Sequence, residues 1–303
     1  MSYRFGDLIL ASEFPCTQLP AVDAAPDCTF VLRRGRAWRP HWEQAWPAVG
    51  GEVALVGARE GDAYRLGVPG VAVFSIDATA TRIAGAAEGD ASAETIEHLL
   101  VDQVLPRLLA HRGRLVLHAG GVLTPFGAVA FIGESGMGKS TLCSALARAG
   151  HRVLGDDGLV VRPRPDGAPD VLATYPGLRL LPESLHELHG ADVPTTPVAS
   201  GRPKRRVAIG GGAGPAPLRA IYALAESRDV QIHHVRGVDA IMTLVTSSFH
   251  LHWNDPVRSR DHFERVAATV HEVPVRRLGY PRDFAALPRV VSAVIEDLAA
   301  AAA

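Results

Sequence analysis

The spacing of apolar residues divides this chain into two regions. Up to residue 93, apolar residues occur in short runs separated by Gly, Pro and Asp, which is typical of short β-strands joined by turns. The expected strands are 8–10, 30–32, 53–56, 64–66 and 71–74. From Glu94 to His111 the apolar residues recur at the spacing of a helix. The pattern predicts a small β-rich N-terminal domain over 1–93 and a second domain over 94–303 that opens with helix 94–111.

The second region contains a strand, a loop and a helix in direct succession. An apolar run over 128–132 predicts one buried strand, and residues 141–149 predict a helix with an apolar face. The loop between them matches the pattern G-x-x-x-x-G-K-[ST] of phosphate-binding loops. Its residues, all candidates for nucleotide binding, are Gly133, Glu134, Ser135, Gly136, Met137, Gly138, Lys139, Ser140 and Thr141.

Each residue type in this loop has a physical purpose. Glycines let the backbone curl so that successive N–H groups face phosphate oxygens, and the following helix directs its positive end at the same place. Lys139 would supply a cation for the β- and γ-phosphates of ATP, and the Ser140 hydroxyl a ligand for Mg²⁺. A glycine-rich turn that matches by chance is the alternative, and the flanking strand and helix argue against it.

Two adjacent acids, Asp156 and Asp157, follow where the next expected strand ends. Acids at a strand end are commonly turn formers. Their position directly after a phosphate loop and its helix favours chemistry instead. One carboxylate can hold Mg²⁺, and the other can accept a proton from an attacking hydroxyl.

Three segments occur in a fixed order over residues 114–162: LVLHAGG with His118, the loop GESGMGKST, and GHRVLGDD. In order and spacing they resemble the catalytic core of the bacterial HPr kinase/phosphorylase family, which is distantly similar to phosphoenolpyruvate carboxykinases. The resemblance implies an α/β fold with a P-loop kinase domain of that type, preceded by a β-rich domain, with ATP and Mg²⁺ as cofactors. Members often form homo-oligomers, and no residue here decides the oligomeric state.

The same resemblance implies roles for individual residues. Lys139, Ser140, Asp156 and Asp157 would carry phosphoryl transfer to a serine hydroxyl, with His118 close to the aspartates. Asp157 is assigned as the base and Asp156 as the metal ligand beside Ser140, and the reverse assignment stays open. A lone histidine on an apolar strand is also often a core residue, so His118 keeps two interpretations.

One stretch departs from the family pattern. After the aspartates, the family carries a glutamate-containing segment of the E-I-R-G-L-G type that assists metal binding and phosphorolysis. Here the corresponding stretch, 174–180, reads TYPGLRL and contains no acid, which argues against HPr as the substrate and against phosphorylase activity. The chain looks closer to HPr-kinase-related proteins of peptide-tailoring clusters, including lasso peptide kinases, which phosphorylate a serine of a precursor peptide. The segments behind this narrower resemblance are 3–6, 12–13, 175–180, 204–207 and 280–283.

A segment rich in Gly, Pro, Ala and Thr, 190–217, is expected to be a mobile loop. It contains the basic run RPKRR over 202–206. In a phosphotransferase, cations near the cleft can neutralise charge on the transferred phosphoryl group, so Lys204 and Arg205 are candidate nucleotide-binding residues. A solvated basic loop and a nucleic-acid patch are the alternatives.

Composition narrows the range of partners. With 303 residues, 47% of them hydrophobic, the chain is long enough for two domains. A net charge of −1 provides no bulk attraction for nucleic acid or an anionic membrane. Cys16, Cys28 and Cys143 show no metal-ligand spacing and fit a reduced, cytoplasmic compartment. Neither a secretion signal nor an apolar run of membrane-spanning length is expected.

Two further groups of residues have a possible functional meaning. Trp38, Trp42 and Trp46 have helix-like spacing and could form a peptide-docking face, although such stripes more often belong to a core. Four histidines lie near the C-terminal side of the chain without cysteines or clustered acids, so a metal site is not expected there. They are His233, His234, His250 and His252.

Two functions of different classes fit these observations. The first is an ATP- and Mg²⁺-dependent serine kinase for a peptide or protein, with a lasso-type precursor peptide as the narrower expectation and HPr as the alternative. The second is a nucleotide-binding regulatory or assembly module without transfer. Because a binding module has no need of both Asp156 and Asp157, the aspartate pair favours the kinase. A small-metabolite acceptor stays open, since the sequence shows no acceptor pocket.

Overall fold

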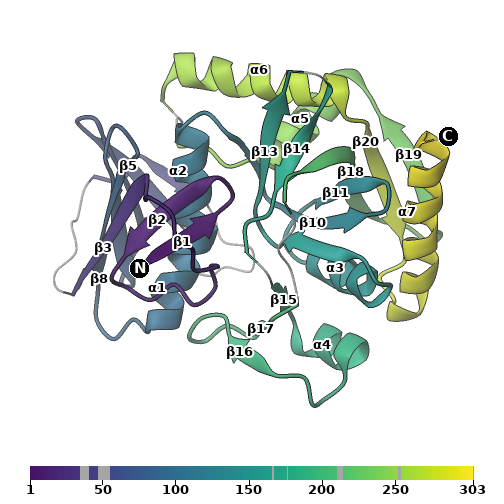
Figure 1. Ribbon diagram of the computed structural model, residues 1–303, viewed down its shortest axis with the longest axis horizontal. Helices are drawn as coiled ribbons and strands as arrows, with labels where there is room; N and C mark the ends of the chain where they lie inside the picture. Colours follow the sequence, from purple (N-terminus) through teal and green to yellow (C-terminus); the bar gives the residue numbers. More distant parts are fainter. Residues whose placement is uncertain are drawn as a thin grey trace. The chain divides into compact units, whose positions relative to one another are not determined.

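The computed structural model describes residues 1–34, 41–46, 55–165, 167–175, 177–209, 214–251 and 254–302. Over these residues the protein is a mixed α/β structure with an eight-stranded, a nine-stranded and a three-stranded sheet (Figure 1). Internal contacts group the chain into two units. The first comprises Met1–Gly113, Val198–Arg202 and His250–Asp255, and the second Arg114–Pro197, Pro203–Phe249 and Pro256–Ala303.

The first unit contains the eight-stranded sheet, in the order β1-β2-β3-β8-β7-β6-β5-β4. Its strands are β1 (Ser2–Phe5), β2 (Leu8–Ser12), β3 (Cys28–Arg34), β4 (Gln44–Trp46), β5 (Leu55–Glu60), β6 (Ala63–Val68), β7 (Ala72–Ile76) and β8 (Arg82–Ala87). The β-rich character expected from the short apolar runs is therefore observed. Of the strand expected over 53–56, the first two residues lie outside the described part of the chain, and the rest belongs to β5.

The helical segment expected over 94–111 belongs to this first unit and consists of three pieces. They are α1 (Ala93–Leu99), a π-helical turn over Leu100–Val104 and α2 (Leu105–His111). Ser92 caps the first piece, since its side chain accepts a hydrogen bond from the Thr95 backbone N–H. Pro106 lies in the first turn of α2, where backbone N–H groups have no partner within the helix. The N–H that proline lacks is therefore not needed there. The wider π-turn thus lets the helical segment continue through a proline.

The segment that contains Trp46 is not helical, because Gln44–Trp46 forms strand β4. Trp42 packs on Val73 and Ala86, and the Arg107 guanidinium lies 5.0 Å from the centre of the Trp46 ring. Trp38 lies outside the described residues. Trp42 therefore belongs to a small apolar cluster, in keeping with the core interpretation of this residue.

The second unit contains the nine-stranded sheet, in which β20 pairs with both β18 and β19 beside the path β12-β10-β11-β18-β14-β13-β9. Its strands are β9 (Leu115–Leu117), β10 (Ala119–Thr124), β11 (Gly127–Ile132), β12 (Arg152–Gly155), β13 (Leu159–Arg164), β14 (Gly167–Leu172), β18 (Ala216–Glu226), β19 (Gln231–Val235) and β20 (Val275–Tyr280). The pairs β11–β18 and β18–β20 are parallel. The carboxyl ends of these three strands therefore point to the same edge of the sheet.

The remaining elements of the second unit surround this sheet. A small sheet has the order β15-β17-β16, formed by β15 (Leu178–Leu180), β17 (Arg205–Val207) and β16 (Thr195–Pro197). The helices are α3 (Lys139–Arg148), α4 (Pro182–His189), α5 (Gly237–Thr246), α6 (Pro256–Glu272), the 3₁₀ turn η2 (Phe284–Ala286) and α7 (Leu287–Ala302). Part of the segment expected as a loop, 190–217, is thus ordered as β16 and β17, while residues 210–213 lie outside the described part.

The helices cover the two faces of the nine-stranded sheet separately (Figure 1). Residues of α3 and α7 share one apolar cluster with β11 and β18, and residues of α5 and α6 share the other. Over the described residues, no helix is long and apolar enough to cross a membrane.

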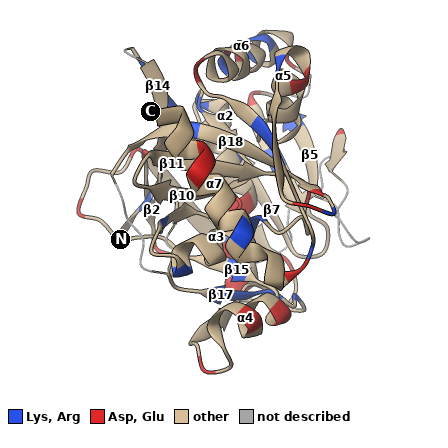
Figure 2. Ribbon diagram, turned by 90° about the vertical axis from the view of Figure 1, so that its right-hand side faces the viewer, with Lys and Arg blue, Asp and Glu red and all other residues tan. Residues whose placement is uncertain are grey.

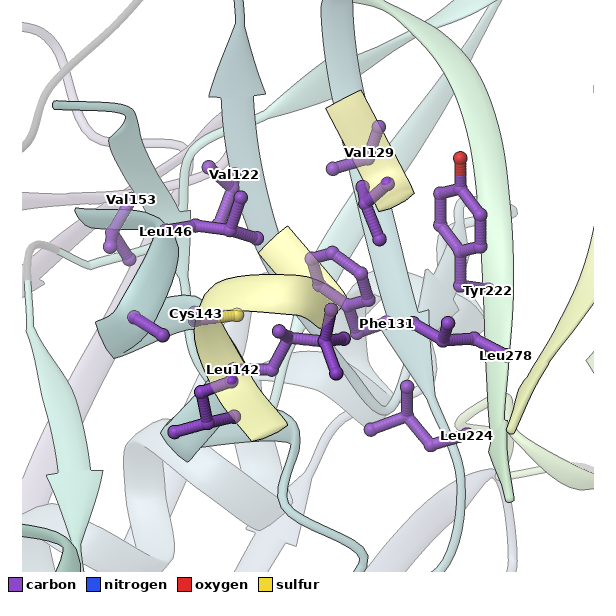
Figure 3. Packing of buried hydrophobic residues seen from close by; sticks show 14 of the residues in the cluster. Val122, Val129, Phe131, Leu142, Cys143, Leu146, Val153, Tyr222, Leu224 and Leu278 are labelled. Carbon is purple, nitrogen blue, oxygen red and sulfur yellow. The ribbon is translucent and has the colours of Figure 1, made fainter. Parts of the chain in front are cut away.

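Close packing fixes α3 against the sheet (Figure 3). Phe131 of β11 stacks on Tyr222 of β18 with ring centroids 5.7 Å apart, and Leu142 and Cys143 of α3 are fully buried in the same cluster. A Cβ atom on Gly120 of β10 would lie 2.6 Å from the Cys143 sulfur. Glycine at this position therefore lets α3 approach β10, and Cys143 is a packing residue. The loop between β11 and α3 is consequently fixed at both ends.

We expect Phe131→Ala to lower the free energy of unfolding by about 3–5 kcal/mol, because the surrounding side chains cannot close the cavity that it leaves. Urea unfolding followed by circular dichroism would measure the loss. Phe263→Ala is the matched control, since Phe263 of α6 is 47% exposed and should cost less than about 0.5 kcal/mol. Similar small losses in both variants would contradict this account of the core.

Candidate active site

The phosphate loop, residues 133–138, joins β11 to α3 with three glycines in the left-handed half of conformational space. Gly133, Gly136 and Gly138 have φ values of 146°, 85° and 90°. A side chain at these positions would strain the backbone. Gly138 is the N-cap of α3 and provides no side-chain hydrogen bond to the helix. The first turn of α3 therefore directs unpaired N–H groups toward the loop, as an anion-binding site requires.

Lys139 folds back over the loop. Its Nζ donates hydrogen bonds to the carbonyl oxygens of Gly133 (2.7 Å) and Glu134 (3.2 Å), and the residue is buried. Burial lowers the pKa of Lys139, while the charges of Asp157 and Asp156 oppose that shift. The two aspartates thus stabilise the charged form of the Lys139 ammonium group.

The other loop residues differ in accessibility. Glu134, Ser135 and Gly136 are exposed, and Met137 is half-buried. Thr141 is directed elsewhere, because its hydroxyl lies 3.1 Å from the Ser184 hydroxyl of α4. The structure therefore leaves 134–136 open to a ligand and uses the Thr141 side chain to fix α4 on α3.

Asp156 connects the end of β12 to the first turn of α3. It is fully buried, and its Oδ1 accepts a hydrogen bond from the Ser140 hydroxyl at 2.9 Å. Its Oδ2 accepts another from the Arg179 backbone N–H at 2.8 Å. Burial and the neighbouring Asp157 charge raise the pKa of Asp156 to about 6, although Arg179 opposes the shift. Ser140 and Asp156 together present the oxygen ligands that Mg²⁺ prefers.

Asp157 has the opposite electrostatic character. Its backbone is left-handed, with φ 62°, and its side chain is 17% exposed. Its Oδ1 lies 3.8 Å from His118 Nε2, and its Oδ2 lies 3.4 Å from Arg179 Nη1. Burial alone would raise the pKa of Asp157, but the charges of His118, Lys204, Arg179 and Lys139 outweigh it and hold the pKa below its usual range. Asp157 is therefore ionised at neutral pH.

His118 directly follows β9 and is not a core residue. Its backbone N–H donates to the Ser247 carbonyl at 2.6 Å, and its ring meets the Phe249 ring edge-on at 5.7 Å. The side chain is 36% exposed and faces Asp157. Partial exposure beside a carboxylate suits proton transfer better than structural support.

Arg179 is a site residue that the sequence analysis did not identify. It lies on β15, its side chain is 1% exposed, and it contacts both aspartates through its backbone and its guanidinium. The guanidinium also lies 4.5 Å from the centre of the Tyr175 ring. The signal in the sequence was a single charge between two leucines, since a buried arginine is almost always paired. Pro176, in the same stretch, lies outside the described residues.

Basic residues lie at β17 (Figure 2). The two basic candidates there have different surroundings. Lys204, directly before β17, is half-buried, and its charge acts on Lys139, Asp156 and Asp157. The Arg205 guanidinium instead donates to the Thr195 hydroxyl of β16 at 3.1 Å. The structure therefore brings Lys204 to the aspartate pair and uses Arg205 to connect two strands of the small sheet.

Other possible sites lie apart from these residues. A cavity of about 320 Å³ between the β13–β14 hairpin and α6 is lined by none of the candidate residues. Within the described ranges, no group of three or more His, Cys, Asp or Glu side chains is placed to hold a metal ion. His233 and His234 lie on β19, and His252 is outside those ranges.

We expect Arg179→Met to cost about 3–5 kcal/mol of stability at pH 7.5, because it removes the buried guanidinium that pairs with Asp157 and stabilises the charged form of Asp156. The loss should be smaller at pH 5. Asp156, with its pKa near 6, is then mostly protonated in the folded state, so only Asp157 needs compensation. Urea unfolding at both pH values would measure the difference, with Arg277→Met on the exposed face of β20 as control. Equal losses at both pH values would indicate that Arg179 acts only by packing on Tyr175.

Comparison with known proteins gives a limited result. No protein-family model matches the chain, and no curated protein matches it. Among solved structures, it is similar to the HPr(Ser) kinase/phosphatase from Coxiella burnetii, with 11% identity, a TM-score of 0.33, and coverage of 60% of this chain and 95% of that one. A similarity this distant carries no functional argument, so the function has to be argued from the site itself.

Proposed function

We propose that this protein is an ATP- and Mg²⁺-dependent kinase that transfers the γ-phosphate to a serine hydroxyl of a peptide or protein. The observation that carries the proposal is the 2.9 Å hydrogen bond between Ser140 Oγ and Asp156 Oδ1. It joins a phosphate loop to a strand end that also bears Asp157, a second, partly exposed carboxylate. Binding alone needs only the loop, whereas transfer also needs a group that receives the acceptor hydroxyl.

The residues of the site fit the nucleotide and the metal ion. The loop N–H groups, the first turn of α3 and Lys139 would hold the β- and γ-phosphates, and Ser140 and Asp156 would hold Mg²⁺. Bound Mg²⁺ would neutralise charge on the phosphate oxygens. Lys139 would exchange its bonds to the Gly133 and Glu134 carbonyls for bonds to phosphate.

Asp156 and Asp157 would have different roles, because their surroundings differ. Both oxygens of Asp156 already accept hydrogen bonds from Ser140 and Arg179, and the residue is inaccessible to an acceptor. Asp157 is partly exposed and ionised, so its Oδ1 can accept a hydrogen bond from the serine hydroxyl and take its proton. A low pKa makes it a weak base, but the loose transition state of phosphoryl transfer needs orientation more than basicity. His118, 3.8 Å away, can pass the proton to solvent.

The cations around Asp156 and Asp157 would stabilise the transferred phosphoryl group. Arg179 holds the Asp157 carboxylate from the buried side, and Lys204 approaches from the start of β17. Cations in such positions stabilise charge on the phosphoryl oxygens in the transition state. Arg179 is fixed by packing, whereas Lys204 is half-buried and is the more accessible of the two.

A nucleotide-binding module without transfer is the second candidate. The second carboxylate counts against it, since a module that only binds nucleotide has no need of a partly exposed, ionised Asp157 beside Asp156. The proposal does not specify the molecule that accepts the phosphate. HPr, a precursor peptide of the lasso type and a small metabolite are the candidates, and an assay has to separate them.

The test is transfer of labelled γ-phosphate from ATP with Mg²⁺, measured in parallel with HPr and with a candidate precursor peptide that ends in serine. Label on the peptide alone would support a tailoring kinase, and label on HPr would support an HPr kinase. ATP binding without label on either acceptor, or on a screen of cellular peptides and metabolites, would favour the module.

In this assay, Lys139→Ala and Asp157→Asn should each lower transfer by about 10²–10³-fold, because each removes one electrostatic contact to the reacting groups. Circular dichroism should show an unchanged fold. Asp229→Asn, in the exposed turn before β19, is the matched control and should leave transfer unchanged. Near wild-type transfer by either site variant would refute the role given to that residue.

The two basic residues should differ when each is replaced alone. Lys204→Ala should lower transfer about tenfold, which corresponds to about 1.4 kcal/mol, with a smaller effect on ATP affinity. Arg205→Ala should have little effect on transfer, since its guanidinium binds Thr195. Isothermal titration with ATP, beside the transfer assay, would give both quantities. Equal losses of binding and transfer in Lys204→Ala, or equal effects of the two variants, would contradict this distinction.

A further inference from the structure

The end of β20 lies beside the phosphate loop. In the sheet register, Ile132, the last residue of β11, lies beside Ala223 of β18, which in turn pairs with Arg277 of β20. β20 therefore continues for three more residues, to Tyr280, past the point where β11 gives way to the loop. The segment 280–283, which reads Tyr-Pro-Arg-Asp, is thus placed next to residues 133–138 although it is far away in sequence.

Two side chains of this segment bind consecutive carbonyl groups of the loop. The Tyr280 hydroxyl donates to the Met137 carbonyl at 3.2 Å, and Arg282 Nη2 donates to the Gly136 carbonyl at 2.8 Å. A Cβ atom on Gly138 would lie 2.9 Å from the Tyr280 oxygen. Tyr280 therefore also explains why the last residue before α3 has to be small.

Hydrogen bonds and packing hold the backbone on both sides of Tyr280 and Arg282 in place. Tyr280 is buried, which raises its pKa to about 12, so its hydroxyl keeps the proton that it donates at neutral pH. Its carbonyl accepts a hydrogen bond from the Ser227 N–H, and Asp283 caps η2 by accepting from the Ala285 N–H. From η2 the chain enters α7, which shares an apolar cluster with α3.

These contacts act on the N–H groups that a phosphate would meet. In a planar trans peptide the carbonyl and the N–H point in opposite directions. Binding of the Met137 carbonyl by Tyr280 therefore turns the Gly138 N–H away from Tyr280, and no described residue accepts a hydrogen bond from it. Lys139 binds the carbonyls of Gly133 and Glu134 in the same way. Four loop carbonyls are thus held by side-chain donors.

We propose that Tyr280 and Arg282 are positioning residues: they form a clasp that holds the phosphate loop in its anion-binding shape and thereby sets its affinity for a nucleoside triphosphate. The inference rests on the proposed function only in the identity of that ligand. The clasp acts on the loop and not on the reacting atoms. Its loss should therefore weaken nucleotide binding and leave the rate of the bound complex nearly unchanged.

The first test needs no nucleotide. Hydrogen exchange of the Met137 and Leu142 amides, which donate to the Glu134 and Gly138 carbonyls of the loop, would be compared among the wild type, Tyr280→Phe, which removes only the hydroxyl, and Arg282→Ala. Exchange should be faster by about 3- to 10-fold in each variant, the equivalent of one hydrogen bond. Tyr222→Phe is the control, because that hydroxyl binds Asp297 in a network remote from the loop. Unchanged loop exchange in both clasp variants would overturn the proposal.

The second test measures ATP affinity, by titration with a fluorescent ATP analogue, together with the KM for ATP and kcat. Tyr280→Phe and Arg282→Ala should raise Kd and KM by about 3- to 10-fold with kcat within about twofold. Arg282→Lys should recover part of the loss, since a lysine can still donate to the Gly136 carbonyl. Arg289→Ala, on the exposed side of α7, should change nothing.

The outcomes separate the clasp from the kinase. Faster loop exchange and weaker ATP binding without phosphoryl transfer by the wild type would support the clasp and refute the kinase. A fall in kcat at unchanged Kd would overturn the clasp, because it would place Tyr280 or Arg282 at the reacting atoms. Failure of Arg282→Lys to recover any ATP affinity would likewise count against the hydrogen bond to Gly136 as the source of the effect.

Discussion

The arrangement of this site depends on keeping two adjacent carboxylates charged in the protein interior. Asp156 and Asp157 follow each other at the end of β12, where burial and mutual repulsion both favour protonation. Asp156 accepts hydrogen bonds from Ser140 and from the Arg179 backbone, and Asp157 is surrounded by cations. Those partners come from four parts of the chain: the first turn of α3, β15, the residue before β17 and the residue after β9. The aspartate pair therefore determines how these four parts meet.

The sequence was sufficient for features that are local. Glycine spacing, the flanking strand and helix, and the acids after the next strand predict the loop of 133–138 and the position of Asp156. Short apolar runs likewise predict the β-rich first region. Each of these follows from residues within a few positions of one another, where backbone preference and periodicity act directly.

The features that the sequence did not reveal depend on contacts between distant residues. Tyr280 binds Met137 across 143 positions, and Arg282 binds Gly136 across 146. No periodicity reports such a pair, because it exists only once parallel strands β11, β18 and β20 fix the register. Arg179 is hard to recognise for another reason: one arginine between two leucines does not reveal whether its side chain is exposed or buried beside carboxylates. Lys204 and Arg205 could not be told apart, since only the pairing of β16 with β17 assigns Arg205 to Thr195.

The balance of charge at the site shows what an acid in the stretch 174–180 would change. Lys139, Arg179 and Lys204 bring three positive charges to the described surroundings of two carboxylates, which leaves an excess of one positive charge (three minus two) before His118 is counted. A further acid in the stretch of 174–180 would cancel that excess and raise the pKa of Asp156 still further. The buried arginine on β15 does the reverse. It favours the ionised form of both carboxylates and leaves the site attractive to an anionic phosphoryl group, as the proposed transfer from a nucleotide requires.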